Sequence, residues 1–535
     1  MKRENDIAYD RRRFLLLSAT TTALAAGGIS IREAAARVGG SLTLVVPSVD
    51  SEDFDPIRFR SAGQHIFYPL VFDPFIAKDP KTGQLTAGLA TSWEVGDGGK
   101  SWIVKLRQGV SFHDGSPFTA ADAKFSIERY IGRFEKVAAS GSERLAGIIT
   151  SVDVIDDLTI VIKSAAGAPT IPFDLAIDVG SASAYVVPKT YIDKIGGDGF
   201  NKAPIGTGPF RFTSQEIGRQ MTFKTNASYW GEVADVDSLS LKIVPELATR
   251  VAQLRSGEAD IVSGIVGPAI PQLKSTSDVR IVAAEKGQLI YLVIGGMTNP
   301  SSPLSKPAVR EALSIAIDRQ AIVTHLLYGQ GAPASLFGFP FSFGWPADAD
   351  KYPAAYDPAK AKSLLSTAGY PSGFDLTLYA ATEGRDFAQA IAQFWTAVGV
   401  KVDLQVREIS QVLAENRSDA GKAATRISLV FGATGSGARA DFGGLLHTYL
   451  AAGVYVQPHG DQELTDWVLK QASENDPTLR AKMLGEILKR VYQKNYVIPL
   501  YYADSLFAVG KSVASWQPIP GVGYPSNLNS VKRSI

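Results

Sequence analysis

Cysteine is absent from this sequence, and neither sign of charge is in excess. None of the 535 residues is a cysteine, which excludes disulfide bonds, thiolate metal sites, a cysteine nucleophile and a lipid anchor attached to cysteine. The 54 basic residues are balanced by 53 acidic ones. This balance gives no electrostatic reason to expect nucleic acid or an anionic membrane as a partner.

The motifs of common enzyme classes are missing as well. Ser436 lies closest to a GxSxG serine-hydrolase pattern, but Thr434 and Ala438 occupy the positions of the two required glycines. No HExxH zinc motif is present, and His447 and His459 have no further metal-binding residues grouped around them. We therefore expect no catalytic site, no metal site and no cofactor.

The N-terminus has the features of an export signal. Residues 10–15, DRRRFL, match the twin-arginine pattern, and an apolar stretch continues to about Gly28. This stretch spans roughly 15 residues, fewer than the ~20 that a membrane-crossing helix needs. Residues 1–36 are expected to be a signal peptide cleaved after Ala36, with Ala26 as the alternative site. The alternative to twin-arginine export is a Sec signal that happens to carry arginines; in both cases we expect an exported, soluble, periplasmic protein.

The length and the apolar content indicate several lobes, since 535 residues with 45% hydrophobic side chains exceed what one core usually supports. The C-terminal half alternates strands and helices, which predicts adjacent parallel strands with right-handed crossovers. An earlier stretch shows the same alternation and forms a second α/β unit. The strands are expected at 374–379, 400–406 and 427–431, and earlier at 239–243 and 259–262; the helices are expected at 385–398, 409–414 and 248–255.

Two α/β units predict a cleft between them. In open α/β sheets, ligands bind beyond the carboxyl ends of the strands. The loops expected to line the cleft are therefore 245–247, 380–385 and 432–441.

Residues 88–129, GLATSWEVGDGGKSWIVKLRQGVSFHDGSPFTAADAKFSIER, predict a strand, a turn and a helix. Apolar residues alternate from Trp102 to Leu106, as in a partly buried strand. The turn contains His113 and Asp114, and Thr119 followed by Asp122 has the spacing of a helix capping box. Nothing in the segment is expected to be catalytic.

Further motifs follow in a consistent order along the chain. Together with residues 88–129, they resemble the extracytoplasmic solute-binding proteins of ABC importers, in the family that captures oligopeptides, dipeptides, nickel chelates and some sugars or opines. The motifs are FDP at 54–56, YPLV at 68–71, PIGTGPF at 204–210, NASYW at 226–230, AVREALSIAIDRQAIVTHLLYG at 308–329 and IPLYY at 498–502.

The resemblance implies an α/β fold of the type II periplasmic binding protein class, with two α/β lobes around a cleft plus an extra inserted lobe. It places ligand between lobes I and III, which close about a hinge, and makes the turn at His113 a conformational element remote from ligand. The implied bounds are 37–82, 204–293 and 507–535 for lobe I, 83–203 for lobe II and 294–506 for lobe III.

The function implied by the resemblance is that of a monomeric receptor that delivers a solute to a membrane permease and has no chemistry of its own. The solute is left open among peptides, opines, glycosides and metal chelates. Two alternatives stay open: a ligand-presenting sensor or chaperone of the same fold, and a secreted hydrolase with an unrecognised site.

The residues expected to contact ligand follow from the same resemblance. In peptide-binding relatives an aspartate after the third strand pairs with the peptide amino group; here Thr434 or a neighbour occupies that place. Asp441 looks more like a conformational aspartate, and Arg439 is either a carboxylate or phosphate ligand or a surface residue. The aromatic loop 335–345 either lines a pocket or packs within its lobe. The full predicted set is Phe54, Tyr291, Thr382, Arg385, Phe431, Gly432, Thr434, Arg439 and Asp441.

Overall fold

The structure is a computed structural model and describes residues 39–82, 84–134, 139, 142–176, 182–430, 441–451 and 461–534. The chain divides into residues 1–37 and a compact unit of residues 38–535; the second unit is described below. The predicted signal peptide lies outside the described residues. Within the described part, no helix is both long enough and apolar enough to cross a membrane.

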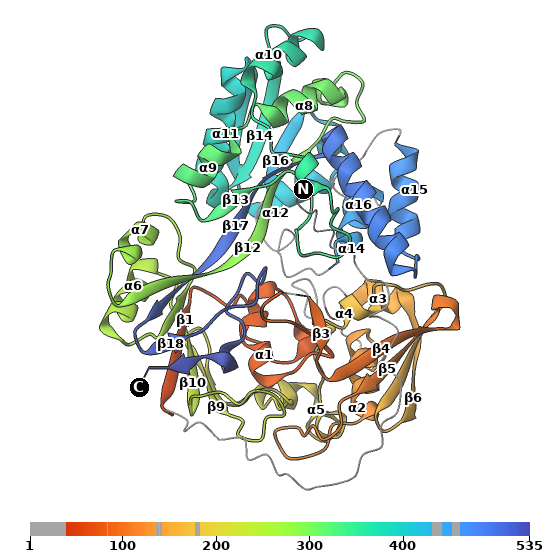
Figure 1. Ribbon diagram of the computed structural model, residues 1–535, viewed down its shortest axis with the longest axis vertical. Helices are drawn as coiled ribbons and strands as arrows, with labels where there is room; N and C mark the ends of the chain where they lie inside the picture. Colours follow the sequence, from red (N-terminus) through yellow and green to blue (C-terminus); the bar gives the residue numbers. More distant parts are fainter. Residues whose placement is uncertain are drawn as a thin grey trace, which may run out of the picture. The chain divides into compact units, whose positions relative to one another are not determined.

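One large sheet organises the compact unit (Figure 1). Ten of its strands follow one path, and β13 (Gly331–Pro333) pairs with β17 beside it. In spatial order the path is β15 (Lys401–Arg407), β14 (Asp375–Ala381), β16 (Arg426–Val430), β12 (Val279–Ile294), β17 (Val497–Gly510), β11 (Ile261–Ser263), β1 (Ser41–Val46), β10 (Ser238–Ile243), β9 (Gln220–Thr225) and β8 (Phe210–Glu216).

The sheet contains two sets of parallel strands, separated along this path by β12 and β17. In the first set, β1 pairs in parallel with β10 and β11; in the second, β14 pairs in parallel with β15 and β16. The predicted parallel strands of the C-terminal half are thus confirmed. The two earlier predicted strands, β10 and β11, are separated by β1, because hydrophobic periodicity identifies strands but carries no information on their spatial order.

Two long strands connect the parallel sets. β12 and β17 run antiparallel for most of their length; β12 continues to pair with β16, and β17 with β11. Their pairing is interrupted between Ala284 and Gln288. Lys286 has a φ of 53° there, and its backbone N–H donates to an Asp504 carboxylate oxygen at 2.9 Å. This bulge bends the ladder where the chain passes from one set to the other.

A separate antiparallel sheet of four strands follows the order β4-β5-β7-β6. The predicted strand, turn and helix of residues 88–129 are confirmed here: the helix packs against β6 and β7, and the Thr119 N–H donates to Asp122 Oδ2 at 3.0 Å, closing the capping box. We call β4 to β7 with their helices the small-sheet unit. It comprises β4 (Ala90–Gly96), β5 (Ser101–Leu106), α2 (Ala120–Tyr130), α3 (Ser142–Ile148), β6 (Ile149–Asp156), β7 (Thr159–Ser164) and α4 (Ile171–Asp174).

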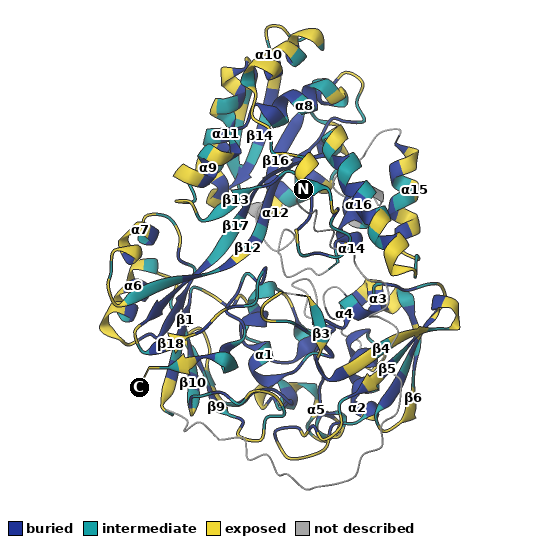
Figure 2. Cartoon of the chain, viewed as in Figure 1, coloured by how far each residue is buried: buried dark blue, intermediate teal, exposed yellow. Residues whose placement is uncertain are grey.

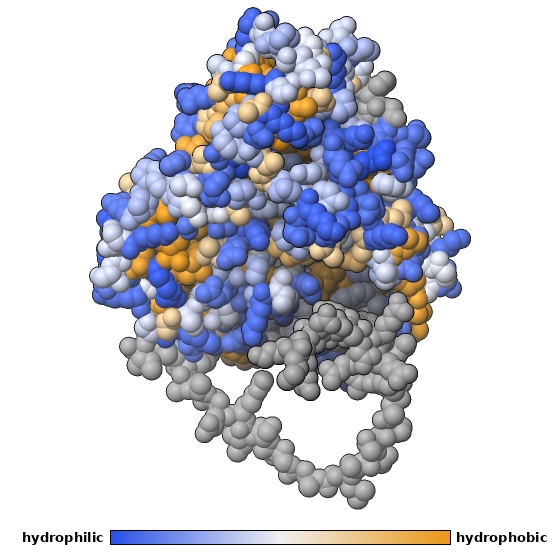
Figure 3. Space-filling view, turned by 45° about the horizontal axis from the view of Figure 1, so that its top comes forward, coloured by the Kyte–Doolittle hydropathy of each residue, from blue (hydrophilic) through white to orange (hydrophobic). Residues whose placement is uncertain are grey.

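Buried hydrophobic residues form two main cores, visible as dark blue segments along the strands in Figure 2. The first core draws on residues 42–284 and 507–531, and joins the small-sheet unit to the first parallel set. The second core draws on residues 289–502. Hydrophilic side chains cover most of the face shown in Figure 3, with hydrophobic patches between them. A chain of this length is thus stabilised by more than one core, as expected.

Helices cover the second parallel set. Asp357 caps α10 (Pro358–Thr367) through a 2.8 Å hydrogen bond from the Lys360 N–H. Trp395 is completely buried in the second core, and its indole N–H donates to the Leu313 carbonyl at 2.9 Å. The helices of this region are α8 (Pro307–Ile315), α9 (Arg319–His325), α10 (Pro358–Thr367), α11 (Arg385–Ala397), α12 (Ile409–Arg417), α13 (Asp419–Ala423), α14 (Gly443–Leu446), α15 (Gln462–Gln471) and α16 (Pro477–Lys494). Elsewhere, α6 (Leu247–Ser256) packs against β11, α7 (Ala269–Lys274) against β12, α1 (Tyr68–Val71) against β8 and α5 (Lys189–Lys202) against α2.

Candidate functional site

The candidate site is formed by the loops at the carboxyl ends of the two parallel strand sets. Such loops are where open α/β sheets bind ligands, because the strand ends leave room for side chains from several loops to converge. On the first set these loops follow Val46, Ile243 and Ser263; on the second set they follow Ala381 and Arg407.

Arg250 holds together two loops of the first set. Its Nη1 donates to the carbonyls of Val244 and Pro245 at 2.8 and 2.5 Å, and Nη2 donates to the carbonyl of Gly264 at 3.1 Å. Burial lowers the pKa of the guanidinium. Gly264 has a φ of 68°, and a Cβ there would lie 3.2 Å from the Pro47 ring. The rim of the first set is therefore fixed by backbone contacts.

Thr382 and Arg385 lie on the rim of the second set, as predicted. Thr382 begins a short turn after β14, Arg385 begins α11, and both side chains are exposed. Contact with ligand stays a prediction for both. Sequence reasoning missed Arg407 at the carboxyl end of β15, whose guanidinium lies 4.4 Å from the centre of the Tyr379 ring. Its position as the last residue of an alternating strand was the available signal.

Asp441 is engaged by the protein itself. One carboxylate oxygen lies 2.5 Å from Arg480 Nη1, and the other accepts the backbone N–H of Gly443 at 2.6 Å. Both side chains are nearly inaccessible, at 1% for Arg480 and 6% for Asp441. This geometry supports the conformational role, and ligand binding by Asp441 stays a prediction.

Tyr291 and Phe54 are fully buried. The hydroxyls of Tyr291 and Tyr449 lie 2.5 Å apart. The Phe54 ring packs against Phe67 and Phe212, with ring centres 4.8 and 4.6 Å away. Side chains without exposed surface contact a solute only after their neighbours move, so ligand contact by these two residues stays a prediction.

The remaining predicted contacts, Phe431, Gly432, Thr434 and Arg439, lie outside the described residues, as does His459. In the aromatic loop, Phe337 and Phe339 are completely buried in the second core, which is the packing alternative. Within the described part, no group of three or more His, Asp or Glu residues is placed to hold a metal ion.

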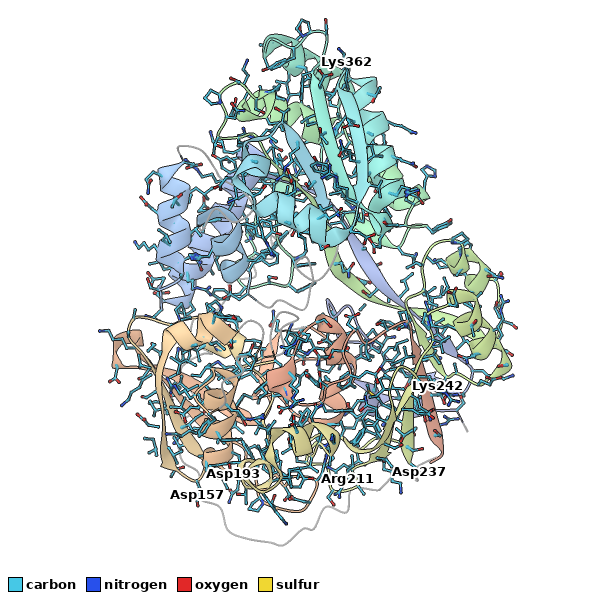
Figure 4. All side chains as sticks on the ribbon, turned by 180° about the vertical axis from the view of Figure 1, so that it is seen from behind. Asp157, Asp193, Arg211, Asp237, Lys242 and Lys362 are labelled. Atoms are coloured by element: carbon cyan, nitrogen blue, oxygen red, sulfur yellow. The ribbon has the colours of Figure 1, made fainter. Side chains whose placement is uncertain are left out.

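The turn at His113 bonds to the returning segment 204–210. His113 Nε2 donates to the Gly208 carbonyl at 3.0 Å, and the Gly206 N–H donates to Nδ1 at 3.3 Å. Burial lowers the pKa of His113 to about 4, so the ring is neutral at pH 7. Arg211 on β8, labelled in Figure 4, donates to the His113 carbonyl at 2.6 Å. Every one of these bonds is structural, which supports the conformational reading of the turn.

Asp73 bonds to the same segment and was missed by sequence reasoning. Its carboxylate accepts from the Thr207 hydroxyl at 2.9 Å, the Tyr229 hydroxyl at 2.8 Å and the Trp230 indole N–H at 2.7 Å. Burial nevertheless raises the pKa of Asp73 to about 6. Nothing local in the sequence marks this aspartate, because its partners are over 130 residues away.

Comparison with known proteins identifies the family. The sequence profile of the bacterial extracellular solute-binding proteins, family 5, middle region, matches residues 84–440. The dipeptide-binding protein of Escherichia coli K12 is 29% identical over 403 residues, 69% of this chain and 73% of that protein. The glutathione-binding protein GsiB of E. coli O1:K1 is 26% identical over 531 residues, 97% of this chain and 98% of that protein.

Solved structures show the same fold. HbpA2 from Haemophilus parasuis superposes with a TM-score of 0.79 at 23% identity, covering 93% of this chain and 100% of that one. The periplasmic binding protein DppA from Helicobacter pylori, in complex with the peptide STSA, superposes with a TM-score of 0.72 at 22% identity, covering 93% and 99%. The predicted periplasmic binding protein fold is thus confirmed, and the chain belongs to family 5 of the bacterial extracellular solute-binding proteins.

Proposed function

We propose that the protein is a periplasmic receptor that captures a peptide or peptide-like solute and delivers it to the permease of an ABC importer. Family membership supports solute binding, and the relatives named for dipeptide and glutathione binding support a peptide-like solute. The observation that carries the proposal is the pair of parallel strand sets, each with loops at its carboxyl ends, joined within one sheet.

The connection between the two sets suits closure around a solute. β12 and β17 each contribute residues to both main cores. The bulge at Ala284 to Gln288 lies in β12 between its residues of the first core and its residues of the second core. A strand pair that bends at a bulge lets two lobes rotate while each keeps its own core. Enclosure would then strengthen polar contacts to the solute by excluding water. The proposed lobes I, II and III keep the bounds expected from the sequence.

Export by the twin-arginine route, with cleavage of residues 1–36, is part of the proposal and rests on the DRRRFL sequence at 10–15. The receptor is proposed to work as a monomer without catalysis. Two observations support the absence of catalysis. The family consists of binding proteins, and the hydrogen bonds of His113 and Asp73 are made to other parts of the protein.

Thermal unfolding of the mature protein with added solutes tests this function. The panel comprises dipeptides, glutathione, opines, glycosides and nickel chelates, and hits are titrated by calorimetry. A solute present at 100 times its Kd should stabilise the protein by about 2.7 kcal/mol. We expect saturable stabilisation by a peptide-like member with 1:1 stoichiometry. Product formation from any member during incubation would instead support the hydrolase.

A further inference from the structure

The small-sheet unit contacts the segment between α15 and α16 through two glycines. Gly99 lies in the turn before β5, Gly167 lies in the loop after β7, and the side chain of Asn475 fits against both. A Cβ built on Gly99 would lie 1.9 Å from Asn475 Nδ2; one built on Gly167 would lie 2.4 Å from the same atom and 2.5 Å from the Ser473 carbonyl oxygen. A Cβ on either glycine would require the facing atoms of Asn475 or Ser473 to shift, which shows how closely the two surfaces approach.

A second contact lies on the neighbouring helix of the same unit. The ring of Phe173, on α4, packs against Phe343 with ring centres 5.4 Å apart. The guanidinium of Arg480, on α16, lies 5.9 Å from the Phe173 ring centre and 5.3 Å from that of Phe343. A guanidinium facing aromatic rings gains from both cation–π attraction and packing.

Arg480 links this contact to the candidate site. Besides its bond to Asp441, it donates from Nε to the Gln471 carbonyl and from Nη2 to the Gln471 side-chain oxygen, both at 3.0 Å. Phe343 also forms a parallel bridge with Asp441. Asp441 ends the predicted ligand loop 432–441, so one buried guanidinium contacts both the small-sheet unit and the end of that loop.

We propose that these contacts form a latch between the small-sheet unit and residues 473–480 with Phe343, and that Arg480 is a positioning residue coupling the latch to Asp441. The small-sheet unit then takes part in closure and helps to hold Asp441 in place. This inference rests on the proposed function, since closure matters only if the protein captures a solute.

The latch is built to open. The Asn475 side-chain oxygen is buried and has no hydrogen-bond partner, and its amide nitrogen donates only to Ser473, at 3.4 Å. A buried polar atom left without a partner opposes the contact that buries it. The apolar contact of Phe173 and the cation–π contact of Arg480 favour closure. Because the unpartnered oxygen of Asn475 opposes the contact and the Phe173 and Arg480 contacts favour it, the latch can form when a solute binds and break when the solute leaves.

Paired cysteines test the contact directly, because the chain has no cysteine of its own. The Cβ position of Gly167 lies 3.2 Å from Asn475 Cγ, so cysteines at the two positions fall within disulfide range. We expect Gly167→Cys with Asn475→Cys to form an intramolecular disulfide on mild oxidation of the full chain. The readout is the loss of two free thiols and of about 2 Da, the mass of the two hydrogen atoms lost when one S–S bond forms. Two persistent, reactive thiols would overturn the proposal.

Gly147→Cys with Asn475→Cys is the matched control. Gly147 lies on α3 of the same unit, and a Cβ there would have nothing within 4 Å. This pair should keep both thiols under the same oxidation. Equal oxidation of both pairs would show unselective collision and would also overturn the latch. No solute is needed, so failure here leaves the receptor function standing.

The coupling through Arg480 is tested by hydrogen–deuterium exchange in Phe173→Ala. This substitution removes the aromatic contact from the small-sheet unit and leaves the Arg480 and Asp441 bond in place. We expect exchange of residues 441–446 to rise several-fold while β5 is unchanged. Ile155→Ala, at a residue 62% exposed in the same unit, should change neither segment. Unaltered exchange of residues 441–446 in Phe173→Ala would refute the positioning role.

Discussion

His113 and Asp73 bind the same tripeptide, Gly206 to Gly208, from two sides. His113 bonds to the backbone of both glycines, and Asp73 bonds to the hydroxyl of Thr207 between them. A Cβ on Gly206 or Gly208 would lie 2.1 or 2.7 Å from the Val71 carbonyl oxygen. The glycines of the PIGTGPF motif are therefore required by close backbone approach, and two buried ionisable groups hold the segment in place.

His113 should make stability depend on pH. Its pKa is about 4 in the folded protein, against about 6.5 unfolded. The unfolded state then binds the extra proton, so this stabilisation is present above pH 6.5 and falls by about 3 kcal/mol as pH drops to 4. His113→Gln removes the titration and keeps a donor and an acceptor. Urea unfolding from pH 4 to 7 should show that stability falls less toward acid in the variant than in the wild type; parallel curves would contradict this.

Asp73 should act in the opposite direction over nearly the same range. Its pKa is raised from 3.8 to about 6 in the folded protein. The folded state then holds the extra proton between these values, so this contribution is complete below pH 3.8 and falls by about 3 kcal/mol as pH rises through 6. Asp73→Asn removes it. The variant's stability should rise more steeply with pH than the wild type's between pH 4 and 6, and a shallower slope would contradict the assignment.

Asp55 and Arg129 join the first FDP motif to α2 by a buried ion pair. Arg129 Nη1 and Nη2 donate to Asp55 Oδ1 and Oδ2 at 2.6 and 2.7 Å, and the two side chains are 1% and 0% exposed. Arg129→Met leaves the carboxylate buried and unpaired, which should cost about 3–5 kcal/mol in urea unfolding. Asp55→Asn in the Arg129→Met background should recover part of that loss. Simple additivity of the two substitutions would show that the pair is not coupled.

Local patterns predicted local structure well. The alternation from Trp102 to Leu106 and the capping box at Thr119 each report a bond or contact within a few residues, and both predictions are confirmed. The family resemblance, carried by motifs in order, led to the fold class. The sequence could not place β1 between β10 and β11, because strand order is decided by packing across distant segments.

The candidate site was harder to predict for the same reason. Thr382 and Arg385 could be placed on the rim from the sequence because they follow a recognisable strand, whereas Phe54 was selected by motif and is completely buried. Arg480 pairs with Asp441 from 39 residues away, and Asp73 meets Thr207 from 134 residues away. No periodicity reports contacts of this kind, which exist only once the two cores have formed.

The central claim is that the protein captures a solute, and native mass spectrometry of protein purified from its own host tests it most directly. Gentle ionisation should retain a bound small molecule, released as one peptide-like mass per chain on denaturation. Such a mass, with stabilisation of the solute-free protein when the compound is restored, is the predicted result. A protein that carries no solute and is stabilised by none of the peptides, opines, glycosides or metal chelates would contradict the account.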